Sequence, residues 1–189
     1  NQFSVNYPQY LTLSPNQESL VRFRTGQNLG RGFNANRGVF FDYELNWSNG
    51  EKGQGAFTYT GMGRDDYQIG LRQFSRLSER TQASFQLLSP AGQSLFFNTS
   101  VSNQNKGFQW TVNSNVQRSI QGFRSDGAAV NVVAEKDPVK VGKLPLRIFP
   151  GIRADLGDRT IESLQIDGNG NLVPVITQFS QSAYGAQLR

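Results

Sequence analysis

The sequence of 189 residues contains no cysteine and no histidine. Without thiols it can form neither a disulfide framework nor a thiolate metal site, and it has no thiol nucleophile. Without imidazoles it also lacks the usual general base and the commonest metal ligand of enzymes. These absences argue against a conventional hydrolase or metalloenzyme, and we expect neither a cofactor nor a metal site.

Long hydrophobic runs are missing as well. The mean hydropathy is −0.49, and no stretch approaches the roughly 18 consecutive apolar residues of a membrane helix. This excludes a helical membrane protein but not a transmembrane β-barrel, whose strands leave a much weaker signal. The formal net charge of +5 suits an anionic lipid or an acidic glycan. The basic residues are spread singly along the chain, so nucleic acid is not an expected partner.

The clearest pattern that is present covers residues 37–60, where apolar and mostly polar residues alternate with a period of two. This period is typical of a β-strand with two different faces, and the turn residues at 48–53 predict a hairpin. A soluble β-sandwich would bury the apolar side in a core, whereas a transmembrane barrel would turn it toward lipid. The candidate lipid-facing residues are Phe41, Tyr43, Leu45, Trp47, Phe57 and Tyr59.

The same alternation continues strand by strand to about residue 112, and no helical period interrupts it. The polar side of these strands is rich in Gln, Asn, Ser and Thr, which fits the water-filled lumen of a barrel better than the charged surface of a soluble sandwich. We therefore predict an all-β fold, an antiparallel up-and-down transmembrane β-barrel. The segment 1–189 would supply about ten to twelve of its strands.

Individual residues stand out within this pattern. Pro8 interrupts the first strand, and a proline inside a strand marks an edge because it cannot donate to the ladder. Arg22 and Arg24 share one side of a strand over residues 18–25, and Arg72 lies on the polar side of a later strand. These three arginines are candidate contacts for anionic groups in a lumen, although arginines on a strand are often simply solvated.

Two acidic motifs have ordinary explanations. Asp42 and Glu44 share a strand face and could form a catalytic carboxylate pair, but a solvated pair is far commoner, so we do not expect an enzyme. Residues 167–171 (DGNGN) superficially resemble part of a calcium loop. They lack its further acidic ligands and closing glutamate, so a plain turn is predicted.

Three motifs within residues 1–110 together resemble the LptD family of lipopolysaccharide-assembly proteins of the bacterial outer membrane. The first is YPQYLTLSPN at residues 7–16, which is similar to the family's opening strand and Pro-Asn turn. The second is Asn36-Arg37-Gly38 before an alternating strand. The third is the strand at 53–59 followed by Arg64-Asp65-Asp66.

This resemblance implies a barrel in the outer membrane that passes lipopolysaccharide or a related glycolipid to the outer leaflet, through its lumen and a lateral seam. It also implies a plug lipoprotein and periplasmic transport-bridge proteins as partners. Prolines weaken the seam in the family: Pro8 matches the first, whereas Phe23 stands at the position of the second. The seam candidates are Pro8, Pro15 and Phe23.

Two departures from the family pattern limit the match. The disulfides of the family have no counterpart in a chain without cysteine, and the sequence has no periplasmic domain before the strands. The chain is therefore expected to be the N-terminal part of a barrel. The alternative hypothesis is a soluble β-sandwich or jelly-roll module that binds an acidic glycan.

Overall fold

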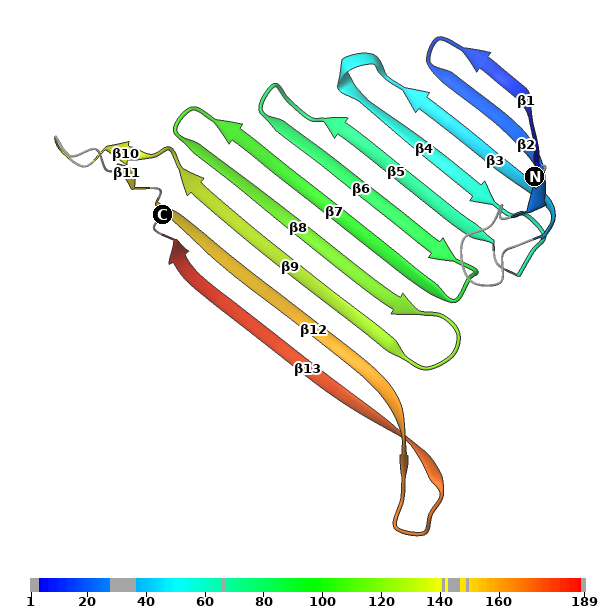
Figure 1. The fold of residues 1–189 in the computed structure, drawn as a ribbon. Helices are drawn as coiled ribbons and strands as arrows, with labels where there is room; N and C mark the ends of the chain where they lie inside the picture. The colour runs from blue at the N-terminus through cyan, green and yellow to red at the C-terminus, as the bar shows by residue number, and fades with distance from the viewer. Residues whose placement is uncertain are drawn as a thin grey trace.

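The computed structural model consists of one eleven-stranded antiparallel sheet, and it describes residues 4–27, 37–65, 67–140, 142, 147, 148 and 150–187. The strands follow one another in chain order (Figure 1), which confirms the predicted all-β, up-and-down arrangement. They are β1 (Ser4–Ser14), β2 (Gln17–Gln27), β3 (Arg37–Ser48), β4 (Gly53–Thr60), β5 (Gln68–Arg76), β6 (Thr81–Pro90), β7 (Ser94–Asn105), β8 (Phe108–Ser119), β9 (Ser125–Lys136), β12 (Gly151–Ile166) and β13 (Leu172–Gln187).

Several connections are short, as the turn residues predict, whereas the connection from β9 to β12 spans residues 137–150. A single 3₁₀ turn, η1 (Gly50–Lys52), links β3 to β4, and a two-stranded pair, β10 (Val139–Lys140) and β11 (Arg147–Ile148), lies between β9 and β12. Pro15 and Asn16 form the predicted β1–β2 turn. The segment 167–171 is the predicted turn between β12 and β13, whereas Asn36 and Asp66 of the family-like motifs lie outside the described residues.

The sheet is open. β1 and β13 lie at its two ends, and no ladder pairs one with the other among the described residues (Figure 1). Within the same residues no helix is both long enough and apolar enough to cross a membrane.

Cross-strand register separates an apolar face from a polar face, because directly opposed residues of an antiparallel pair point to the same side. The apolar face carries Tyr43 opposite Tyr59 and Leu45 opposite Phe57. All six candidate lipid-facing residues share it. One of its register rows runs across seven strands as Ser19, Leu45, Phe57, Leu71, Leu87, Phe97 and Val116.

No described element lies across the apolar face, because the elements contact only their neighbours in the sheet or in the turns (Figure 1). Phe41 on this face is 45% exposed, and its ring makes an edge contact with Phe23 at 5.5 Å between centroids. Near the far edge, Ile152 is 64% and Tyr184 is 85% exposed. The described residues thus supply no second layer in which these side chains could be buried.

The buried side chains cluster at one end of the sheet instead. Within the described residues they belong to β2, β3 and β4, and they are Ser19, Leu20, Phe40, Asp42 and Ala56. By register all of them except Ser19 lie on the polar face. β1, in contrast, is exposed from Asn6 to Ser14, and its pairing with β2 shifts register between Tyr10 and Thr12 rather than at Pro8.

Candidate functional site: a polar belt across the sheet

Two neighbouring register rows of the polar face form a continuous band, which we call the polar belt. Its rows remain aligned because pairing from β2 to β13 proceeds without a register shift. The first row is Glu18, Asn46, Ala56, Arg72, Gln86, Asn98, Asn115, Ala129, Gly157 and Gln181. The second row is Ser48, Gln54, Phe74, Ser84, Ser100, Asn113, Asn131, Asp155 and Ala183.

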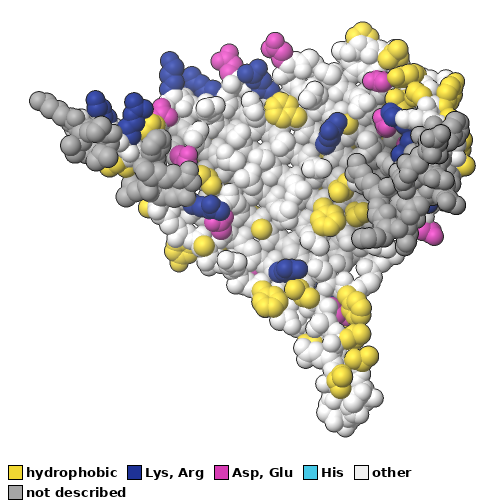
Figure 2. Space-filling model, viewed as in Figure 1, with side chains coloured by type: hydrophobic (Ala, Val, Ile, Leu, Met, Phe, Trp, Pro, Cys, Tyr) yellow, Lys and Arg dark blue, Asp and Glu magenta, His cyan; other side chains and the backbone are white. Residues whose placement is uncertain are grey.

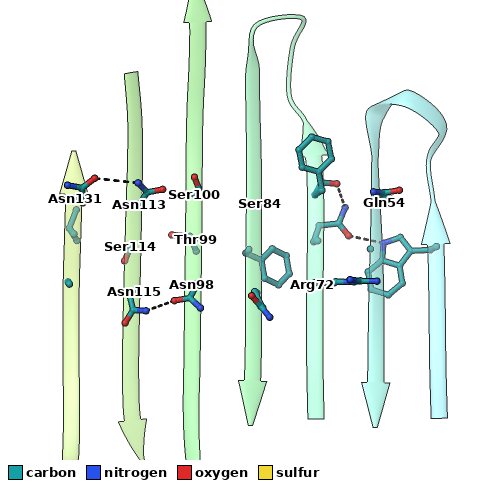
Figure 3. Close-up of a pocket in the computed structure, with 18 of the residues that line it drawn as sticks. Gln54, Arg72, Ser84, Asn98, Thr99, Ser100, Asn113, Ser114, Asn115 and Asn131 are labelled. Atoms are coloured by element: carbon teal, nitrogen blue, oxygen red, sulfur yellow. Dashed lines mark hydrogen bonds between the residues drawn. The ribbon is translucent and has the colours of Figure 1, made fainter. Parts of the chain in front are cut away.

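The polar belt lines a hollow of ≈ 1220 Å³, and Leu13 of β1 and Pro15 and Asn16 of the β1–β2 turn line it as well. Figure 2 shows that the middle of the visible face carries few hydrophobic or charged side chains. The close-up shows labelled side chains of the belt on β4 to β9: Gln54, Arg72, Ser84, Asn98, Ser100, Asn113, Asn115 and Asn131 (Figure 3). The belt is therefore a wet surface of neutral hydrogen-bonding groups.

Side chains within the belt bond to one another across strands (Figure 3). Asn115 Nδ2 donates to Asn98 Oδ1 at 2.5 Å, and Asn113 Nδ2 donates to Asn131 Oδ1 at 3.4 Å. Asn131 Nδ2 in turn donates to Asp155. Because each amide offers two donor hydrogens and an acceptor oxygen, these bonds position the side chains and leave hydrogen-bonding capacity for a ligand.

The charged groups of the belt differ in whether they are compensated. Arg153 Nε, next to the belt, donates to Asp155 Oδ2 at 2.7 Å, so these two charges neutralise each other. Arg72 is exposed and has no hydrogen-bond or ion-pair partner among the described residues. Glu18, the remaining charge, stands three strands away from Arg72 in the same row. Arg72 is thus the locally uncompensated cation of the hollow.

The other two candidate arginines share the polar face with Arg72 but have carboxylate partners. Arg22 pairs with Glu44 at 3.2 Å, and Arg24 Nε pairs with Asp42 Oδ2 at 2.5 Å. Both pairs are diagonal, since the register places Arg22 opposite Asp42. The carboxylates that could have formed a catalytic pair are therefore each engaged with a guanidinium group.

Asp42 also holds the β4–β5 turn. It is 3% exposed, and its Oδ1 accepts a hydrogen bond from the Gly61 amide at 2.8 Å. Beside it, the ring of Phe40 lies 5.4 Å from the Arg24 guanidinium and 4.2 Å from that of Arg64. In such cation–π contacts the guanidinium groups are attracted to the face of the ring, which stabilises the buried position of Phe40. This anchor cluster of Arg24, Phe40, Asp42, Gly61 and Arg64 joins β2, β3 and the turn.

The seam candidates occupy different places. Pro8 lies in the edge strand β1 opposite Arg22, and its neighbour Tyr7 lies opposite Phe23, so the structure brings Pro8 and Phe23 together in the β1–β2 pair. Pro15 is separated from them in the turn at the end of that pair. Phe23 points to the apolar face, where it contacts Phe41.

Reasoning from the sequence did not single out the amides of the belt or Phe74. The available signal was their spacing at alternate positions on each strand, but a row becomes visible only when the strands are in register. Within the part of the chain that the structure describes, no group of three acidic, histidine or cysteine side chains could hold a metal ion. Comparisons with protein-family models, curated proteins and solved structures gave no match.

Proposed function

We propose that the chain is a segment of an outer-membrane β-barrel that passes lipopolysaccharide, or a related glycolipid, to the outer leaflet. The observation that carries this proposal is the two-faced sheet: a polar belt with a hollow on one side and an uncovered apolar surface on the other. Exposing such an apolar surface to water is unfavourable. A bilayer would cover it, while the polar face would line an aqueous passage.

In this proposal the protein performs no bond chemistry. The hydrophilic part of the glycolipid moves along the polar face, where amides and hydroxyls replace water one hydrogen bond at a time. Of the three candidate arginines, Arg72 is the one able to meet an anionic group without first leaving a carboxylate partner. The edge strand β1, which contains Pro8, supports a lateral seam because an edge with fewer ladder bonds opens at lower cost.

The proposed partners follow from this role. They are lipopolysaccharide or a related glycolipid, the outer membrane, a plug lipoprotein and periplasmic transport-bridge proteins. The described sheet contributes eleven strands with two unpaired ends, so closing the barrel requires further strands beside β1 and β13.

The first experiment measures whether folding depends on detergent. The chain is purified with and without detergent micelles, and far-UV circular dichroism is recorded together with size-exclusion chromatography. A monodisperse β-rich species that forms only in micelles supports the membrane proposal. A β-rich monomer in plain buffer overturns it.

Two matched variants then test which face meets lipid. Phe97→Arg places a charge on the apolar face of β7, and Ser100→Arg places the same charge on its polar face. In vesicles, Phe97→Arg is expected to destabilise the folded protein by about 2–4 kcal/mol, the cost of an arginine near the bilayer midplane, whereas Ser100→Arg is tolerated. Equal effects in a urea titration would contradict the assignment of the faces.

The alternative, a soluble β-sandwich or jelly-roll module for an acidic glycan, needs a protein layer over the apolar face. The described residues provide none, and no separate observation favours this reading over the barrel. Binding of a glycan is nevertheless compatible with the amides and hydroxyls of the polar belt. Such binding can be measured whether or not the chain inserts into a membrane.

A further inference from the structure

Phe74 is the one aromatic residue in the two rows of the polar belt, and it is 37% exposed. Arg72 lies two residues earlier on the same strand and the same face, so the two Cα atoms are about 7 Å apart. Gln54 and Ser84 flank Phe74 on the neighbouring strands, and Gln86 lies beside Arg72. An exposed aromatic ring, an uncompensated guanidinium and several amides thus occupy neighbouring positions in the lining of the hollow.

We propose that this place, the Arg72–Phe74 subsite, binds an acidic saccharide. The apolar face of a sugar ring packs on the Phe74 ring, which offers a rigid hydrophobic surface without demanding hydrogen bonds. The hydroxyls of the sugar exchange hydrogen bonds with Gln54, Ser84 and Gln86. The guanidinium of Arg72 pairs with an anionic group on the saccharide, a phosphate or a carboxylate, both of which fit its planar fork.

The polar belt extends the subsite in one direction. From β5 to β9 it crosses four interstrand spacings, about 19 Å in all, and presents Gln86, Asn98, Asn115 and Asn131 in turn. Asn98 and Asn115 are already oriented by a bond to each other, and Asn131 by a bond to Asp155, so a ligand orders few groups on binding. An extended oligosaccharide lying across the strands fits this geometry.

On the other side of Arg72, its neighbour in the first row is Ala56, which is buried and uncharged. It stands directly opposite Arg72 on β4, between Asn46 and Arg72 in the first row. A ligand that fits this place has one anionic group on a neutral, hydroxyl-rich body. The anionic group matches the guanidinium, and the hydroxyls match the uncharged amides of the belt.

This inference rests on the proposed function in one respect, since it assigns the hydrophilic part of the same cargo to the polar belt. The two can fail separately. Saccharide binding is measured on the folded chain in solution, in micelles if folding requires them, whereas the membrane proposal depends on insertion into vesicles. If the chain binds the saccharide but does not insert into vesicles, the subsite is supported and the membrane proposal is contradicted.

The binding experiment uses four probes and isothermal titration calorimetry on the full chain. Maltotetraose with a terminal phosphate and maltotetraose with one terminal C6 carboxylate test the two sources of the anion. Neutral maltotetraose tests the sugar alone, and inorganic phosphate tests the anion alone. We expect at least one acidic oligosaccharide to bind about tenfold more tightly than maltotetraose, and inorganic phosphate to bind more weakly than either. Comparing the two acidic probes shows which anion Arg72 prefers.

Three variants assign the roles. Arg72→Gln is expected to lower affinity for the acidic probe about tenfold and to leave the affinity for maltotetraose unchanged, because a charge-assisted pair is lost. Phe74→Leu is expected to lower affinity for both saccharides about fivefold, since the ring platform is lost. Arg76→Gln is the matched control: Arg76 lies on the same strand and face but outside the belt and the hollow, so both affinities should stay the same.

The proposal is overturned if the folded wild-type chain binds none of the saccharides at millimolar concentration. It is also overturned if Arg72→Gln and Arg76→Gln weaken the acidic probe equally, because this would indicate a diffuse charge effect. If inorganic phosphate binds as tightly as the phosphorylated oligosaccharide, the sugar contributes nothing to the affinity. The subsite would then be a simple anion site, and the saccharide proposal would be wrong. Circular dichroism on each variant verifies that the β-sheet is intact.

Discussion

Gly55 allows the indole of Trp47 to lie across the neighbouring strand. A Cβ atom at this glycine would stand 2.3 Å from Trp47 Cε2 and 2.4 Å from Gln73 Oε1, far inside van der Waals contact. Trp47 Nε1 donates to that same Gln73 oxygen at 2.8 Å. The missing side chain thus makes room for an aromatic packed over β4 and for its hydrogen bond.

Gly55→Ala is therefore expected to displace the indole and to lower the free energy of unfolding by about 1–3 kcal/mol through overpacking and a lost hydrogen bond. Tryptophan fluorescence and urea denaturation measure the two effects. Gly185→Ala is the control, since Gly185 also lies in a strand and a Cβ there would meet nothing within 4 Å. If both variants have the fluorescence and the free energy of unfolding of the wild-type chain, Trp47 does not pack on Gly55 as described.

Asp42 and Glu44 provide a second comparison between single residues. Asp42→Asn weakens the buried bond to Arg24 and the bond from Gly61, so we expect a loss of about 2–3 kcal/mol in the free energy of unfolding. Glu44→Gln removes a more exposed pair, whose partners have side chains 30% and 29% exposed, and should cost less than about 1 kcal/mol. A larger loss in Glu44→Gln, measured by urea denaturation, would contradict the role of Asp42 as the anchor of β2 and β3.

At the scale of single elements, β1 differs from the strand beside it. Its side chains are exposed from Asn6 onward, and it contains a register shift. β2 is held to β3 by two ion pairs on one face and the Phe23–Phe41 contact on the other. The β1–β2 ladder is thus the weaker of the two.

We expect the backbone amides of β1 to exchange with deuterium faster than those of β2 and β3, because local opening begins where few contacts must be broken. The other edge strand, β13, is the internal control, since it pairs with β12 over sixteen consecutive residues without a shift. Exchange of β1 as slow as that of β2 would show that β1 does not open separately, and the seam would lose its support.

The β12–β13 turn is a small element with its own pH dependence. Hydrogen bonds from the backbone N–H groups of Asn171 and Asn169 lower the pKa of Asp167. Because its folded pKa lies below that of the unfolded chain, Asp167 stabilises the turn above the ordinary carboxyl pKa. This stabilisation is lost as the pH falls through the folded value.

We expect the NMR shifts of the Asn169 and Asn171 amides to titrate at a pH below the midpoint for Asp in a short peptide of residues 165–173. In Asp167→Asn the same amides should show no such titration. A midpoint equal to that of the free peptide would mean that the turn does not hold the carboxylate in its ionised form.

For the whole molecule, the number of strands constrains how the sheet can close. In an up-and-down sheet of eleven strands, the first and last strands run in the same direction. Joining β1 directly to β13 would therefore require a parallel pair, whereas every observed pair is antiparallel. An antiparallel barrel built on this sheet needs an odd number of additional strands.

Because the chain has no native cysteine, engineered disulfides test this directly. Tyr10→Cys combined with Ala183→Cys, one residue in each edge strand, is expected to give no intramolecular disulfide on mild oxidation. Gln9→Cys with Val21→Cys, a directly opposed pair in β1 and β2, should oxidise readily and serves as the positive control. Mass spectrometry detects the disulfides. Efficient formation of the disulfide between positions 10 and 183 would show that β1 and β13 of one chain meet directly.

Much of the architecture could be predicted from the sequence. The alternation at Val39–Trp47 predicts β3 and its two faces, and the residues at 48–53 and 15–16 predict turns that the structure contains. Strand ends were less predictable: the strand expected over 18–25 extends from Gln17 to Gln27 as β2. Ladder bonds to β1 and β3 extend a strand beyond the residues whose pattern indicates it.

The candidate site was predictable only in part. The alternation along each strand predicted that Arg22 and Arg24 share one side of their strand and that Arg72 lies on the polar side of another. The register places all three on the polar face. Their different surroundings could not be predicted, because Glu44 and Asp42 reach Arg22 and Arg24 diagonally from another strand. The importance of Phe74 likewise depends on its neighbours Gln54 and Ser84.

The sequence by itself determined that this protein is built from two-faced β-strands joined by turns, because the direction of a side chain along a strand depends on its position being odd or even. Only the tertiary structure decided which residues form the polar belt, which arginine is left without a carboxylate, and that the described sheet is open. These properties depend on contacts between residues far apart in the chain, and a one-residue shift in pairing would change both the polar belt and the partners of each arginine.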